Sequence, residues 1–222
     1  IHLSIRRQRQ ICLRYRTNTM KKFLSLLFVA FSFSTALAQV KFTTTFEERD
    51  TGKKPTTGTY ELMSDYVVIE AEGTALDLYN KTIDWINETY NTPSEVIKGQ
   101  VESEYVRIAG STKQPLYYYN MLKQAIPYEG NRYSIELRFK DNKVRFKPTK
   151  LECYIASSQY TVGGWVERQF EAKVANHKGK ENSVGKKTME AQVAYFSGLA
   201  SRLDSYYENG GGSGSKSDDD DW

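Results

Sequence analysis

Tyrosine and arginine are the chemically useful side chains that stand out here, because the chain carries 16 tyrosines and three of them are consecutive. Side chains alternate along a strand, so three tyrosines in a row cannot all face a core. Four basic residues also lie on the face of the predicted strands that is opposite the apolar residues. Rings beside cations suit ligand, glycan or partner contacts; the alternative is charge that protects strand edges. The candidate contact residues are Tyr117, Tyr118, Tyr119, Arg107, Arg138, Arg145 and Lys147.

The residues available for acid–base or nucleophilic chemistry are few. His177 lies in a polar stretch and is expected on the surface, with a role as base or ligand as the alternative. Cys153 lies in the apolar stretch 151–155, which favours a packed core residue over a reactive thiol. Glu102 and Glu104 flank a predicted turn and are interpreted as solvated charge. We therefore expect no catalytic residue, no metal site and no cofactor.

A period-two pattern predicts the strands that carry the candidate residues. Residues 133–139 alternate between apolar and polar types, and 143–147 repeat the pattern after Asp141-Asn142, a two-residue turn that tolerates positive φ. This is a predicted hairpin, in which Pro148 marks an edge or a bulge. Residues 156–186 are compatible with either a strand or a loop. The other predicted strands are 66–70, 95–101 and 105–110.

Two amphipathic helices are predicted. Thr74 and Asp77 have the spacing of a capping box before the first helix. The second covers about 187–208 and ends at Asn209-Gly210. Each helix has one apolar stripe, which must pack on something apolar. The simplest arrangement is an α+β fold, in which a curved antiparallel sheet carries both helices on one face and leaves the other face open.

The N-terminal part has the pattern of an export signal. Met20 and two lysines precede an apolar stretch, and Ala36-Leu37-Ala38 forms a small-x-small cleavage site. A membrane anchor is the alternative, but the apolar run is shorter than the ~20 residues of a span. The predicted segments are 1–19, an upstream extension for which a matrix-targeting peptide is the alternative; 20–38, a signal peptide; 39–64, an N-terminal segment; 65–208, the α+β domain; and 209–222, a flexible Gly, Ser and Asp tail.

Removal of residues 1–38 would reverse the sign of the net charge. The whole sequence has 31 Lys and Arg against 27 Asp and Glu, and seven basic but no acidic residues lie in 1–38. The remaining part therefore has 24 basic and 27 acidic residues, a net charge of −3. Modules that bind nucleic acids usually present a basic face. No nucleic-acid partner is expected.

Several stretches carry a family resemblance. Residues 77–90 (DLYNKTIDWINETY), 95–99 (EVIKG), 104–110 (EYVRIAG) and 135–146 (IELRFKDNKVRF) resemble the domain of unknown function 4468 family, with Asn142 where Gly is commoner. The resemblance covers about 65–155. It implies a fold similar to that of the TATA-binding protein, with the order β-α-β4-α, and an exported protein of Bacteroidetes-like bacteria. Its motifs are structural, so it implies no catalytic residue.

The expected function is that of a non-enzymatic module in the periplasm or cell envelope. The open sheet face would bind an unknown envelope protein, a small ligand or a glycan. A periplasmic hydrolase or transferase that uses carboxylate or tyrosine residues is one alternative, and a structural subunit of an envelope complex is another. No integral membrane span is expected after cleavage of the signal.

Overall fold

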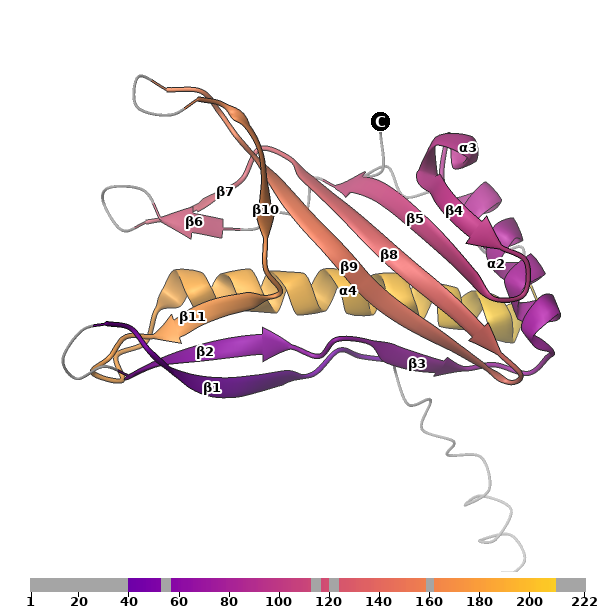
Figure 1. Cartoon of the computed structure of the whole chain (residues 1–222), viewed down its shortest axis with the longest axis horizontal. Coiled ribbons are helices and arrows are strands. Elements are labelled where there is room, and N and C mark those ends of the chain that lie inside the picture. The colour runs from indigo at the N-terminus through magenta and orange to yellow at the C-terminus, as the bar shows by residue number, and fades with distance from the viewer. Residues whose placement is uncertain (1–39, 53–56, 113–116, 120–123, 159–161, 211–222) are drawn as a thin grey trace, which may run out of the picture. The chain divides into compact units, whose positions relative to one another are not determined.

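The computed structural model describes residues 40–52, 57–112, 117–119, 124–158 and 162–210. The predicted upstream extension, the predicted signal peptide and most of the predicted tail lie outside these ranges. Within them the chain is α+β, with antiparallel sheets and helices, as the sequence pattern predicts (Figure 1). No helix in these ranges is long and apolar enough to cross a membrane.

The main sheet is built around the predicted hairpin, which is confirmed. Asn142 in its turn has a φ of 62°. The second strand of the hairpin is long enough to pair with different strands at its two ends. The order is β10-β9-β8-β5-β4, and β3 pairs with the first part of β9. The bounds are β3 (Val67–Glu70), β4 (Ile97–Val101), β5 (Tyr105–Thr112), β8 (Asn131–Lys140), β9 (Lys143–Ile155) and β10 (Gly164–Arg168).

A bulge lies at the position that Pro148 predicts. Ile135 is opposite Pro148, whereas Ser134 is opposite Lys150, so Thr149 is the extra residue of β9. Because proline has no N–H to donate to the ladder, a bulge at this position costs no backbone hydrogen bond that Pro148 could have donated.

A second sheet and a small hairpin occupy segments in which the sequence pattern predicts no definite element. The second sheet has the order β1-β2-β11 and uses residues of the predicted N-terminal segment and of 156–186. The bounds are β1 (Thr44–Asp50), β2 (Thr57–Met63) and β11 (Glu171–Ala175), with β6 (Tyr117–Tyr119) and β7 (Ala125–Pro127) in the hairpin.

The helices are α2 (Ala75–Thr89), the short α3 (Pro93–Val96) and α4 (Ser183–Asn209). The predicted capping box of α2 is confirmed: Asp77 N donates to Thr74 Oγ1 at 3.2 Å, and Thr74 N donates to Asp77 Oδ2 at 3.0 Å. Helix α4 ends as predicted, because Gly210 adopts a left-handed conformation. It begins about one turn before the predicted start, since Asn182 Oδ1 accepts from Gly185 N at 3.0 Å.

Both long helices lie on one face of the main sheet. Helix α2 packs on β8 and β9, and α4 packs on β3, β11, β2 and on α2 itself. The strand residues that face them are fully buried, and Ile108, Ile135 and Leu137 each have no exposed surface. The elements β3, α2, β4, β5, β8, β9 and α4 follow the expected order β-α-β4-α. The predicted fold class is confirmed.

Phe196 of α4 joins the two sheets. It is 1% exposed, and its ring centroid lies 6.4 Å from that of Phe42, 6.2 Å from that of Tyr133 and 5.7 Å from that of Phe170. Phe42 precedes β1, Tyr133 is in β8, and Phe170 precedes β11. All three contacts are edge-to-face, the geometry that aromatic pairs favour.

The turn between β8 and β9 also caps α2. Asp141 Oδ1 accepts from Ala75 N at 2.9 Å, and Asn142 Oδ1 accepts from Gly73 N at 3.2 Å. The backbone N–H of Asn142 donates to the carbonyl of Gly73 at 2.9 Å. A carboxylate at this end of a helix is favourable because the N-terminal N–H groups carry partial positive charge.

Candidate functional site

The face of the main sheet opposite the helices carries a carboxylate surrounded by guanidinium groups. The side chain of Glu136 in β8 is 10% exposed. It accepts from Arg138 Nε at 2.6 Å and from Arg107 Nη2 at 2.9 Å, and Arg145 Nη2 lies 3.7 Å from its Oε1. We call Glu136 and these three arginines the arginine cluster.

Strand register explains why the cluster forms. Glu136 is directly opposite Arg107 on β5 and Lys147 on β9, and Arg138 is directly opposite Arg145. Side chains at opposed positions on one face are close neighbours. Lys147 lies 3.7 Å from Asp65, which is 83% exposed. The structure therefore brings together all four basic candidate residues.

Two tyrosines flank the cluster. The ring centroid of Tyr105 lies 6.0 Å from Cζ of both Arg107 and Arg138, and that of Tyr66 lies 5.7 Å from Cζ of Arg145. Sequence reasoning missed both rings as site residues. The register could have found Tyr105, because it stands directly opposite Arg138.

The electrostatics of the cluster favour an ionised Glu136. The hydrogen bond from Arg138 holds the pKa of this carboxyl below its usual value, and the bond from Arg107 adds to that effect, although burial opposes it. Glu136 in turn raises the pKa of Arg138. The cluster therefore contains one negative and three positive charges at neutral pH. The side chains of Arg107, Arg138 and Arg145 are 50%, 55% and 40% exposed, respectively.

We expect Glu136→Gln to lower the free energy of unfolding by about 1–2 kcal/mol at pH 7, because charge-assisted hydrogen bonds are lost and three cations remain together. Folding lowers the pKa of Glu136. The contribution of Glu136 to the free energy of unfolding is therefore complete above the ordinary carboxyl pKa, and it is lost as the pH falls through the pKa of the folded state. Urea unfolding of both proteins at pH 7 and in strong acid measures this. A difference that stays constant with pH would contradict the assignment.

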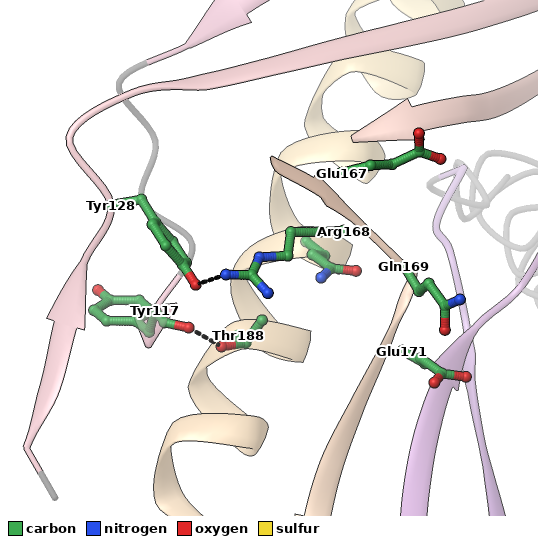
Figure 2. Close-up of a pocket in the computed structure, with 8 residues that line it drawn as sticks. Tyr117, Tyr128, Glu167, Arg168, Gln169, Glu171 and Thr188 are labelled. Carbon is green, nitrogen blue, oxygen red and sulfur yellow. Dashed lines mark hydrogen bonds between the residues drawn. The ribbon is translucent and has the colours of Figure 1, made fainter. Parts of the chain in front are cut away.

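Tyr117 does not lie with the arginine cluster but lines a cavity of about 430 Å³ beside α4 (Figure 2). Its carbonyl accepts from Thr188 Oγ1 at 3.0 Å. Across the cavity Arg168 Nη2 donates to the hydroxyl of Tyr128. Burial raises the pKa of Tyr128 to about 12, so its hydroxyl is protonated at neutral pH. The lining residues are Tyr117, Tyr128, Glu167, Arg168, Gln169, Glu171, Thr188 and Gln192.

Sequence reasoning missed the cavity. Tyr118 and Tyr119 belong to β6 with Tyr117, and their backbones pair with Ile126 and Ala125 in the separate β6–β7 hairpin. Their side chains lie outside the described part of the structure. The three consecutive tyrosines are the one sequence signal for this region. They predict a position on the main sheet, because nothing in the local sequence distinguishes a short separate hairpin from a strand of that sheet.

Comparisons with known proteins give two similar structures. No family model matches the sequence, and no curated protein matches it. A DUF4468 family protein from Bacteroides ovatus is 12% identical, with a TM-score of 0.41 over 65% of this chain and 87% of that chain. A TBP-like protein from Parabacteroides distasonis is 11% identical, with a TM-score of 0.39 over 66% of this chain and 95% of that chain. Both carry the family or fold name that the sequence resemblance gave.

Cys153, Glu102 and Glu104 lie where the sequence pattern predicts, whereas His177 is more buried than the expected surface position. Cys153 has no exposed surface, and its Sγ accepts from Arg168 Nε at 3.1 Å. Glu102 and Glu104 are exposed around the turn before β5, and His177 lies half-buried in the turn after β11. Within the described ranges, no three or more His, Cys, Asp or Glu residues are grouped so that they could hold a metal ion.

Proposed function

We propose that this chain is a non-enzymatic binding module of the cell envelope, and that its open sheet face binds an acidic segment of a partner protein. The observation that carries this proposal is the arginine cluster, in which one buried carboxylate is shared by three partly exposed guanidinium groups. A single Glu136 cannot neutralise three cations, so the face keeps positive charge toward solvent.

Carboxylate groups of a protein partner suit this charge. Guanidinium groups present planar pairs of N–H donors that match a carboxylate. Glu136 already fixes the orientation of Arg107 and Arg138. Binding then costs less side-chain entropy than it would for unrestrained arginines. Tyr105 and Tyr66 supply apolar surface at both sides of the charges.

The envelope location is part of the proposal and is supported by the signal pattern at 20–38. The part of the chain after this segment has a net charge of −3, so a positive sheet face would be a local feature on an acidic protein. Such a contrast favours binding at one surface, because acidic partners are repelled elsewhere.

The test uses the purified protein and an array of Asp- and Glu-rich peptides beside Asn- and Gln-rich versions. The double variant Arg138→Gln/Arg145→Gln should bind the acidic peptides at least about tenfold more weakly, since each tenfold corresponds to about 1.4 kcal/mol. The control Lys178→Gln/Arg202→Gln removes the same charge from exposed positions away from the cluster and should bind normally. Circular dichroism checks that both variants are folded.

Two results would overturn the proposal: equal binding by both double variants, or no preference of the unmodified protein for acidic over amide peptides. The chain's own Asp218–Asp221 run is itself an acidic segment of the kind that the proposal assigns to the cluster. The same peptides are therefore also measured with these four residues changed to asparagine, so that occupancy by the tail cannot hide an affinity for the peptides.

A further inference from the structure

The cavity beside α4 is separate from the arginine cluster and is a second candidate site. Its walls come from β6, from the segment after β7, from the β10–β11 corner and from α4 (Figure 2). Its volume of about 430 Å³ falls in the range of small-molecule sites, which is about 300–1,000 Å³. Because α4 forms one wall, the cavity lies on the helix side of the sheet, whereas the cluster lies on the open side.

Arg168 brings a positive charge to this cavity without a carboxylate partner. Its Nε donates to Cys153 Sγ at 3.1 Å, its Nη2 donates to the hydroxyl of Tyr128, and its Cζ lies 5.1 Å from the centre of that ring. Among the described residues, no Asp or Glu forms an ion pair with it. A guanidinium has five N–H donors, and those on Nη1 have no partner in the described ranges. A partly buried cation of this kind is stabilised by an anion.

Gln192 supplies the second observation. It is 2% exposed, and its Oε1 has no hydrogen-bond partner among the described residues. An unsatisfied buried acceptor costs about 1–3 kcal/mol, and a hydroxyl group of a ligand would remove this cost. Thr188 lies one helical turn earlier, on the same face of α4. Its hydroxyl already donates to the carbonyl of Tyr117, so its oxygen can still accept.

The charged side chains at the wall set the charge that suits a ligand. Glu167 and Glu171 also line the cavity. Glu171 is ion-paired with Arg49 at 2.6 Å, whereas Glu167 forms no ion pair among the described residues. Arg168 is the one basic residue among the described residues that line the cavity, so a single negative charge on the ligand is a better match than a dianion.

We propose that this cavity binds a small hydroxylated carboxylate, of the size of a sugar acid. The carboxylate pairs with Arg168, and ring hydroxyl groups donate to Gln192 Oε1 and Thr188 Oγ1. The rings of Tyr117 and Tyr128 provide flat apolar surface for the face of the sugar. The site does not depend on the arginine cluster, so either proposal can fail while the other holds.

The test compares glucuronate, glucose and glucose 6-phosphate by titration calorimetry. The unmodified protein should bind glucuronate at least about tenfold more tightly than either of the others, the value of one charge-assisted contact. Arg168→Met should remove the preference for glucuronate over glucose. Gln192→Met should weaken both sugars by a similar factor and leave their ratio unchanged. Arg132→Met is the matched control, because Arg132 stacks on Trp165 at 3.8 Å and is not part of the cavity lining.

A second measurement keeps the proposal testable if Arg168→Met does not fold. Adding glucuronate to the unmodified protein should shift the NMR signals of the Arg168 Nε–H and of the Gln192 amide, and should leave the signal of Arg138 in place. Equal affinity for glucuronate and glucose would overturn the proposal, as would unmoved signals at both residues in excess glucuronate.

Discussion

Replacing Phe196 with alanine is expected to lower the free energy of unfolding by about 3–5 kcal/mol, the usual cost of removing a buried aromatic ring. The ring is 1% exposed and contacts Phe42, Tyr133 and Phe170, which come from three separate parts of the chain. Its loss leaves a void that these partners cannot fill together, because they are attached to different sheets. Chemical denaturation followed by circular dichroism measures the change.

Leu76→Ala is the matched control for Phe196→Ala. Leu76 lies in the first turn of α2 with 43% of its surface exposed, so its truncation should change stability by no more than about 0.5 kcal/mol. A loss below about 1 kcal/mol for Phe196→Ala would show that this ring does not join the two sheets.

The second large effect is expected at Gly185, in the first turn of α4. A Cβ built at this position would overlap the backbone carbonyl of Lys173 in β11. Backbone of a paired strand cannot move aside as a flexible side chain can, so Gly185→Ala must push α4 away from the second sheet. Overpacking of this kind costs about 1–3 kcal/mol. We expect a loss at the upper end of that range.

Gly198 in the same helix gives an internal comparison. It is exposed, and a Cβ there meets nothing within 4 Å. Gly198→Ala should therefore raise the free energy of unfolding by about 0.5–1 kcal/mol, because alanine is the better helix former. The two substitutions are chemically identical and should have opposite signs in the same denaturation experiment. A stabilising Gly185→Ala would show that α4 does not approach β11 this closely.

Elements with strong local signals could be predicted from the sequence. The β8–β9 hairpin has clean alternation and a turn residue that accepts positive φ, and α2 has a complete capping box. These signals involve neighbours in sequence, so tertiary packing does not override them. The shared face of Arg138, Arg145 and Lys147 then follows from the register of the hairpin, and Arg107 joins that face through the pairing of β5 with β8.

Strands with polar or short patterns could not be predicted. In β1 the one large apolar residue, Phe46, is 69% exposed, so no buried alternation marks the strand. In β11 only Ala172 and Val174 are buried, which is too short a pattern to separate a strand from a loop. The cavity could not be predicted for a related reason, because Arg168 and Gln192 come to line one cavity only when β11 packs on α4.

The contact between the β8–β9 turn and the start of α2 has a consequence for how this chain can vary. Asp141 and Asn142 serve at once as the hairpin turn and as helix caps. Added residues at this tip would carry both side chains away from Ala75 and Gly73. The turn is therefore a poor place for an inserted tag, a cut that creates new termini, or a length change between relatives, even though its residues are exposed.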